Sequence, residues 1–174
     1  MRWVSLVRNV MLGREGLHRL VLLDVVGAAG CSNAQSHLTT GNVSFDCSEE
    51  DIDEAVAAME AGVESVIGRH EMVAVRSLTS IRQLVEVDRF AGLDPTEWQM
   101  EVAFVRHDAP AIEVELLGET GRTVVVEARD RELLVARPPS GPARPHVNLI
   151  AERATRSPAT SRGWSTLQRI VRAH

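Results

Sequence analysis

The sequence predicts an α+β fold made of two fused ferredoxin-like (split βαβ) halves, each an antiparallel sheet with helices packed on one face, plus C-terminal helices. Three observations predict it. The 174 residues are enough for one domain or two small ones. The first 76 residues show the order strand–helix–strand–strand–helix–strand, and the residues after 97 partly repeat it. We therefore expect a first half over 1–76, a connecting helix and loop over 77–97, and a second half over 98–174.

The clearest element of the first half is a helix over 49–67. Ser48 offers an N-cap, and apolar residues then recur at spacings of three and four, which places them on one face. The segment 17–29 fits either a buried strand or a helix, but its length and the glycines at its end favour a helix. The turn from Thr39 to Asn42 predicts a β-hairpin, because Gly and Asn tolerate positive φ. The strands of this half are expected over 3–8, 34–38, 43–46 and 71–76.

The second half has a less regular pattern. A short helix, capped by Ser77 or Thr79 and ending at Val87, precedes it. The Pro-rich segment 138–142 is expected to be a loop. Strands are expected over 98–106, 123–128 and 132–137, and helices over 110–117, 147–153 and 165–173.

The composition excludes several kinds of chemistry. All 19 basic residues are Arg, and the chain has neither Lys nor Tyr. This removes Schiff-base chemistry, a lysine base, a Walker-type phosphate loop and a phenolic acid. The two cysteines, Cys31 and Cys47, are too few for a disulfide framework. A hairpin centred on Thr40 and Gly41 would place Cys47 opposite Ala34, so we expect both thiols to be apart and reduced.

Motif searches point to neither a cofactor nor a metal. The sequence has no GxSxG, no GxGxxG and no metal-ligand spacing of His or Cys. It shows no signal peptide and no membrane-length apolar run, so we expect a cytoplasmic protein with no membrane contact. The net charge of −5 argues against nucleic-acid binding. Residues 144–174, however, carry six Arg against the single acid Glu152, which favours either recognition of an anion or docking on an acidic surface of the protein itself.

Two polar clusters could carry function. Gln35, His37 and Thr39 alternate along an expected strand and would share one face. His37 would act as a base or hold a ligand, because histidine titrates near neutral pH. The alternative is a partly exposed strand face, with Gly41 and Asn42 serving the turn.

The second cluster runs from Thr160 to Thr166. Ser161 or Ser165 would cap the last helix, whose N-terminus would bind an anion, and Arg162 would add a bidentate fork. The alternative is a simple helix cap with Trp164 as a core anchor.

Both clusters have counterparts in a known family. The segment His37-Leu38-Thr39-Thr40-Gly41-Asn42-Val43-Ser44-Phe45 resembles a Tyr-Leu-Gln-Ser-Gly-Asn-Val-Val-Phe hairpin. The segment Ala159-Thr160-Ser161-Arg162-Gly163-Trp164-Ser165-Thr166-Leu167 is similar to an Ala-Thr-Ala-Arg-Asn-Trp-Arg-Thr-Val signature. The hairpin motif and the signature motif are both those of the bacterial family catalogued as domain of unknown function 1697, which this chain therefore resembles. The resemblance extends over essentially the whole chain and implies two ferredoxin-like halves and a helix over 17–29, with no settled activity.

The chain departs from this family at several of the same positions. His37 replaces Tyr, Thr39-Thr40 replaces Gln-Ser, Gly163 replaces Asn, and Arg144-Pro145 replaces a Ser-Lys pair. The family's opening Arg-Gly-Ile-Asn-Val-Gly-Gly keeps only Asn9-Val10 and one Gly. We therefore expect a divergent member with a rebuilt pocket.

These observations favour binding of a small polar or anionic molecule in a pocket between the two halves. The residues expected to bind it lie at loop ends, where sites usually collect, and are Arg8, Asn9, Thr39, Thr40, Asn42, Arg162 and Trp164. The first alternative is an acid–base or transferase-type enzyme in which His37 is catalytic. The second is an interaction protein that binds an acidic partner through its Arg-rich C-terminus. The sequence favours no oligomeric state.

Overall fold

The computed structural model describes residues 1–139 and 145–174, which divide into two compact units, Met1–Arg82 and Gln83–His174. Arg144 and part of the loop predicted over 138–142 lie outside the described residues. No helix in the described ranges is both long enough and apolar enough to cross a bilayer.

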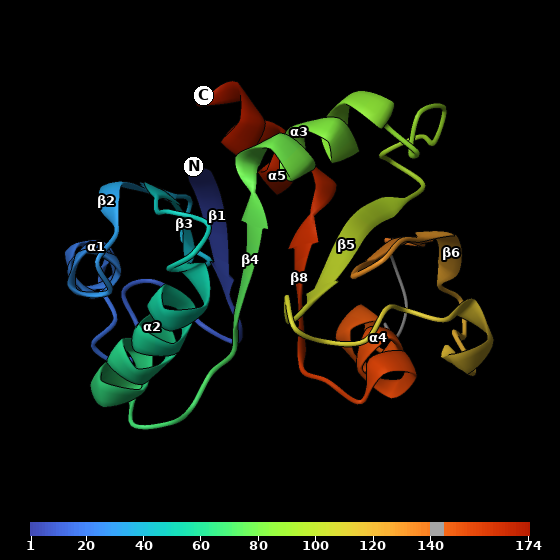
Figure 1. Cartoon of the computed structure of the whole chain (residues 1–174). Helices are drawn as coiled ribbons and strands as arrows, with labels where there is room; N and C mark the ends of the chain where they lie inside the picture. The colour runs from blue at the N-terminus through green and yellow to red at the C-terminus, as the bar shows by residue number, and fades with distance from the viewer. Residues whose placement is uncertain (140–144) are drawn as a thin grey trace. The chain divides into compact units, whose positions relative to one another are not determined.

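The first unit is a four-stranded antiparallel sheet with two helices on one face (Figure 1). Its strand order is β2-β3-β1-β4. The elements are β1 (Arg2–Val7), α1 (Arg19–Ala28), β2 (Ser32–His37), β3 (Asn42–Asp46), α2 (Ile52–Ile67) and β4 (Val73–Ser77). The predicted helices and hairpin of this half are therefore confirmed, with ends that differ by a few residues.

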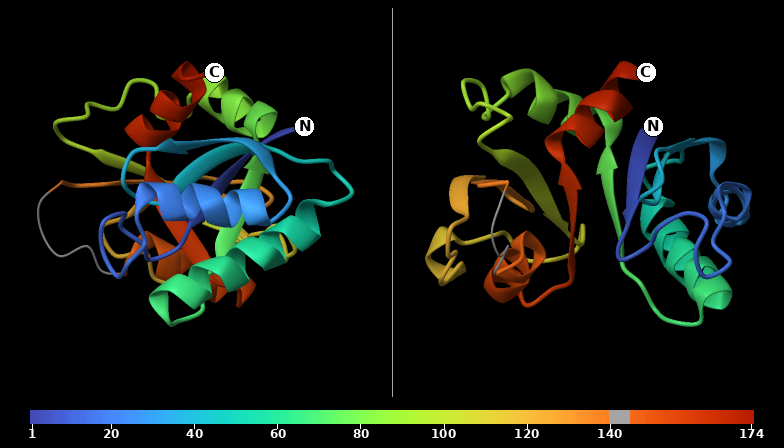
Figure 2. Two further views of the ribbon diagram at one scale, coloured as in Figure 1. Left: turned by 90° about the vertical axis from the view of Figure 1, so that its left-hand side faces the viewer. Right: turned by 180° about the vertical axis from the view of Figure 1, so that it is seen from behind.

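Apolar side chains fill the space between this sheet and its helices. The cluster includes Leu22 of α1, Phe45 of β3 and Met59 of α2. Figure 2 shows α1 and α2 side by side on the same face of the sheet. Gly62 permits this approach, because a Cβ there would lie 2.7 Å from a methyl of Val25.

The N-terminus of α2 differs from the prediction. Its N-cap is Asp51, which makes no side-chain capping bond. The Ser48 hydroxyl instead accepts a hydrogen bond from the Asp51 N–H at 3.0 Å. Ser48 therefore stabilises the turn before α2 rather than its first turn.

The second unit repeats the strand order of the first. Its sheet has the order β6-β7-β5-β8, again antiparallel throughout, and α4 packs on one face. α3 (Leu78–Val87) contains the boundary between the units, and the Ser77 hydroxyl caps it by accepting from the Ser80 N–H, as predicted. The other elements are β5 (Gln99–Val105), the 3-10 turn η1 (Val114–Leu116), β6 (Val124–Ala128), β7 (Glu132–Arg137), α4 (Val147–Thr155), β8 (Ala159–Gly163) and α5 (Trp164–Arg172).

Two predictions in this unit are wrong. The helix expected over 110–117 is only η1, because the Ile112 N–H bonds to the Asp130 carbonyl instead of a helical partner and Glu113 before η1 is extended. Residues 159–163, expected to lead into a helix cap, form the strand β8 that pairs with β5. Only Thr160 in that strand is β-branched, so pairing with β5 overrides weak local propensity.

Candidate functional site

The predicted residues of the first unit gather where β1 ends and the β2–β3 hairpin turns. The Val7 N–H donates to the Gly41 carbonyl at 3.0 Å, and the Leu12 N–H donates to that of Thr39 at 2.8 Å. The structure thus brings the segment after β1, with Arg8 and Asn9, beside the hairpin turn.

Arg8 and Asn9 both contact one buried carboxylate. Glu71 is 5% exposed, and its Oε2 lies 3.6 Å from a guanidinium nitrogen of Arg8 and accepts from the Asn9 amide at 3.3 Å. Its other oxygen accepts from Arg69 at 2.9 Å. Arg69 also binds Glu15, and this contact holds the pKa of the Glu15 carboxyl below its usual value. These contacts join the loop after β1 to the loop before β4.

Asn42 holds the hairpin turn together from inside. Its amide is fully buried and donates to the His37 carbonyl at 3.0 Å and to the Thr40 hydroxyl at 3.1 Å. Thr39 is exposed in the turn beyond β2 and therefore does not continue the strand face of Gln35 and His37.

His37 makes a contact that suits a base and a nucleophile. Its Nε2 lies 2.8 Å from the Ser44 hydroxyl, which also accepts from an Arg2 guanidinium at 2.9 Å. Arg2 in turn pairs with Asp46 at 3.3 Å. Ser44, however, has no exposed surface, and His37 has 8%. Ser44 and His37 are therefore packed inside the protein, whereas Arg2 and Asp46 at the other end of this chain of contacts are partly exposed.

Arg162 is also buried. Its side chain is 7% exposed and one guanidinium nitrogen donates to both the Thr160 hydroxyl and the Ser161 carbonyl at 2.8 Å. Burial lowers the pKa of Arg162 to about 10. α5 begins after Gly163 and no side chain caps it, so the predicted Ser161 or Ser165 cap is wrong. Trp164 packs edge-on against Phe90, with ring centroids 5.0 Å apart, and so anchors α5.

The Arg-rich C-terminal segment is divided among three elements. Arg153 is exposed on α4, Arg162 is buried on β8, and Arg169 and Arg172 are exposed on α5. The arginines of this segment that the structure describes therefore do not share one kind of environment. Among the residues that the structure describes, no group of three His, Cys, Asp or Glu side chains could hold a metal ion.

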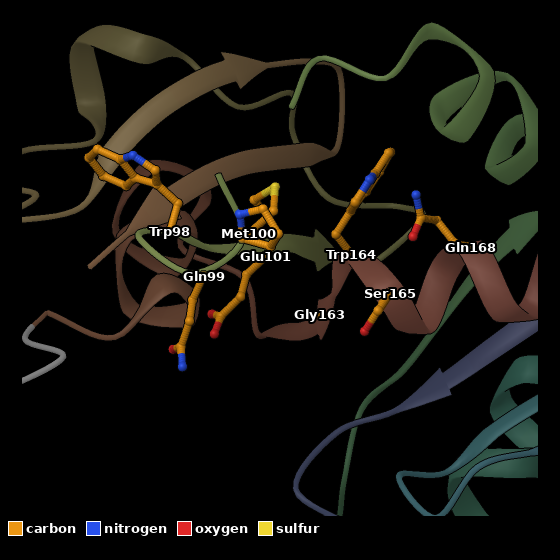
Figure 3. Close-up of a pocket in the computed structure, with 9 residues that line it drawn as sticks. Trp98, Gln99, Met100, Glu101, Gly163, Trp164, Ser165 and Gln168 are labelled. Carbon is orange, nitrogen blue, oxygen red and sulfur yellow. The ribbon is translucent and has the colours of Figure 1, made fainter. Parts of the chain in front are cut away.

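A pocket of about 440 Å³ lies in the second unit, where β5 begins and β8 passes into α5. In Figure 3 the side chains of Gln99, Glu101 and Ser165 point to one side of the chain, whereas Trp98 and Trp164 point to the other. The residues that line the pocket are Pro95, Trp98, Gln99, Met100, Glu101, Gly163, Trp164, Ser165 and Gln168.

Gly163 leaves room beside the strand pair. It lies opposite Glu101 in the β5–β8 ladder, and a Cβ added there would meet no atom within 4 Å. The charge of Glu101 is paired, because its carboxylate accepts from Arg137 at 2.9 Å. The polar side chains that line the pocket are thus neutral, apart from one partly compensated carboxylate.

Of the residues that line this pocket, the sequence predicts only Trp164 as a site residue. Gln99 and Gln168 are far apart in the chain, and only the β5–β8 pairing, which was itself missed, brings their elements together. The solitary Trp98 at the start of a strand was the only local signal.

Comparisons with known proteins give a family and a fold. The model of a protein family of unknown function, DUF1697, matches residues 1–133. Among solved structures, a conserved bacterial protein from Streptococcus pneumoniae is 14% identical, with a TM-score of 0.70 over 99% of this chain and 97% of that chain. At this identity the likeness shows the fold alone. No curated protein matches the chain.

Proposed function

Since the chain belongs to the DUF1697 family of unknown function, we propose from its own pocket that it binds a small molecule with a planar ring and a carbonyl or anionic oxygen. One observation carries the proposal: the residues of one pocket present the indoles of Trp98 and Trp164 on one side of the chain and polar side chains, among them Gln99, on the other. Ligand sites commonly combine aromatic walls with a few polar groups that orient the ligand.

The two kinds of side chain suit the two parts of such a ligand. Indole rings favour stacked or edge-on contacts with a planar ring. The amide groups of Gln99 and Gln168 both donate and accept, so they suit a carbonyl or a ring N–H. A volume of about 440 Å³ lies in the range of small-molecule sites.

The start of α5 supports an oxygen as the polar part. The N–H groups of a first helical turn have no partner inside the helix and favour negative charge. No side chain caps α5, and Gly163, Trp164 and Ser165 all line the pocket. A carbonyl or carboxylate oxygen placed there would accept from this turn.

Tryptophan fluorescence tests the proposal, because two of the three tryptophans line the pocket. Benzoate, nicotinate and uracil serve as probes of ring and oxygen. We expect saturable quenching by at least one of them, with a Kd of about 0.1–1 mM for so small a ligand.

Two glycine variants locate the binding. Gly163→Leu places a side chain in the pocket and should abolish the quenching. Gly27→Leu is the matched control, because a Cβ at Gly27 in α1 also meets no atom within 4 Å. If all three probes fail to quench, or if Gly163→Leu binds as well as the unmodified protein, the pocket is not the binding site.

A second candidate function is acid–base catalysis by His37, favoured by its 2.8 Å contact with Ser44. A fluorophosphonate probe tests it, because an activated serine becomes covalently labelled. Labelling of the protein that is lost in Ser44→Ala would support catalysis, whereas an unlabelled protein would leave the pair as a packing contact.

The strand orders also lead us to propose that each sheet has a split βαβ arrangement, in which the first strand of the unit lies between its third and fourth.

A further inference from the structure

The two cysteines of the first unit directly flank the paired ends of the neighbouring strands β2 and β3. In the β2–β3 ladder Gln35 lies opposite Ser44, but Ser32 lies opposite Asp46. Three steps along β2 thus match two along β3, so a β-bulge adds one residue to β2. Continued by one residue, the register places Cys31 opposite Cys47. The expectation that Cys47 faces Ala34 is therefore wrong, because a regular hairpin register was assumed.

The distance between such positions suits a disulfide. Residues directly opposite in an antiparallel pair have Cα atoms about 4.5–5.5 Å apart, and disulfides span about 4.4–6.8 Å. Both cysteines pack in the apolar cluster beneath α1 and α2. Burial and the neighbouring Cys47 thiol raise the pKa of Cys31 to about 12, which agrees with two sulfur atoms side by side.

The two thiols differ in their access to solvent. Cys31 is 8% exposed, and its thiol points to the Ala29 carbonyl at 3.8 Å. Cys47 is half-buried and lines a hollow of about 340 Å³ together with Gly30, Asp51 and residues of α2. A small oxidant would therefore meet Cys47 first.

We infer that Cys31 and Cys47 form a reversible intramolecular disulfide when the protein meets a hydroperoxide. The Cys47 thiolate attacks the peroxide O–O bond, which gives a sulfenic acid and, with hydrogen peroxide, one water. The Cys31 sulfur then attacks the Cys47 sulfur, the S–O bond breaks, and the hydroxyl leaves as a second water with the Cys31 proton. Two thiols lose two electrons in total, and the peroxide gains them.

The bond would join two boundaries of the fold. Cys31 lies between the end of α1 and β2, the edge strand of the sheet, which it directly precedes, while Cys47 follows the end of β3. Closing the loop 31–47 would hold the end of α1 and the start of β2 against β3. The inferred disulfide depends on the first unit alone and is independent of the pocket in the second unit.

Intact-mass measurement after treatment with hydrogen peroxide tests the inference. We expect the monomeric chain to lose about 2 Da, both thiols to become unreactive, and dithiothreitol to restore them. No Arg lies between the two cysteines and the chain has no Lys, so trypsin leaves both in one peptide. Cleavage before Asp46 separates them, and the two fragments should then remain linked until reduced. The oxidised protein should melt about 5–10 °C higher.

The double variant Cys31→Ser/Ser32→Cys is the matched control. It keeps two thiols but moves one to the neighbouring position, whose side chain points to the other face of β2. We expect its disulfide to form at least about tenfold more slowly, and this difference to vanish in denaturant, where the register is lost. Stable sulfenic acid on Cys47, disulfide-linked dimers, or equal rates for the two proteins would each overturn the inference.

Discussion

The two units have the same strand order, but corresponding positions of their sheets hold different chemistry. In the first unit Ser44 of β3 lies opposite Val4 of β1. In the second, Leu134 of β7 lies opposite Val102 of β5. Ser44 and Leu134 have no exposed surface, so one buried position is polar in the first unit and apolar in the second.

On the fourth strand of each sheet, by contrast, the two units have the same residue at corresponding positions. Val4 faces Arg76 of β4, and Val102 faces Arg162 of β8. Both arginines are buried, and both donate to the carbonyl of the preceding residue at 2.8 Å. A helix starts within two residues of each. The two units thus keep a buried guanidinium where strand passes into helix, while the side-chain hydrogen bonds made by Ser44 have no counterpart at Leu134.

Polar side chains of the first unit also occupy the end of the β1–β3 ladder. Asp46 faces Arg2, whereas the corresponding positions of the second unit hold Ala136 and Met100. One strand order thus accepts either side-chain hydrogen bonds or apolar side chains at these positions. Substitutions at these positions test how much the stability of each unit depends on its polar or apolar side chains.

The largest effect is expected from Leu134→Ser, which gives the second unit the polar residue of the first. It removes a fully buried side chain and buries a hydroxyl in its place, which should cost about 3–5 kcal/mol of unfolding free energy. Urea unfolding measures it, and Leu134→Ala separates the cavity from the hydroxyl. Equal costs for the two variants would show that the hydroxyl finds a partner there.

Leu22→Ala tests α1, whose place between the first two strands is taken by the short η1 in the described part of the second unit. Leu22 of α1 is 1% exposed and belongs to the apolar cluster, so its truncation should cost about 2–4 kcal/mol. Leu116 of η1 is 52% exposed, and Leu116→Ala should cost less than about 0.5 kcal/mol. A Leu22→Ala cost as small as that of Leu116→Ala would mean that α1 contributes little to the stability of its unit.

Ser44→Ala should have a smaller effect, of about 1–3 kcal/mol. The change removes the hydroxyl that contacts both Arg2 and His37, while it leaves almost the same volume. Ser44→Thr retains a hydroxyl and serves as the control for hydrogen bonding. A neutral Ser44→Ala in thermal and urea unfolding would contradict a stabilising role of this contact.

Asp46→Asn should have the smallest effect, below about 1 kcal/mol at neutral pH, because the side chain is partly exposed. Hydrogen bonds from Asn33 and Arg2 hold the pKa of Asp46 below its usual value. A carboxyl with a lowered folded-state pKa stabilises the fold above its unfolded pKa, near 4, and this contribution is lost as the pH falls through the folded value. Unfolding at pH 7 and at pH 2–3 should show the variant and the original protein converging in acid. A difference that persists in acid would assign the effect to the geometry of the amide rather than to charge.

Local sequence patterns predict most of this fold but little of the pocket. The stripe of α2 and the turn at Gly41 depend on neighbouring residues, so periodicity and turn preference identify them. β8 depends on pairing with β5, which no local pattern encodes. The pocket was missed for the same reason. The juxtaposition of Cys31 and Cys47 depends on a single bulge, which spacing alone does not reveal.

The first strand of each unit lies inside its sheet and pairs with the last, and this has a consequence for folding during synthesis. The β1–β4 ladder can form only after Arg76 has been synthesised and can pair with Val4. In the same way, the β5–β8 ladder requires Arg162 to pair with Val102. Contacts between residues so distant in sequence slow folding, because the intervening chain must first be ordered. The ribosome releases the first unit in full before the strands of the second have emerged. Each nascent sheet therefore exposes one side of its first strand until its own final strand arrives.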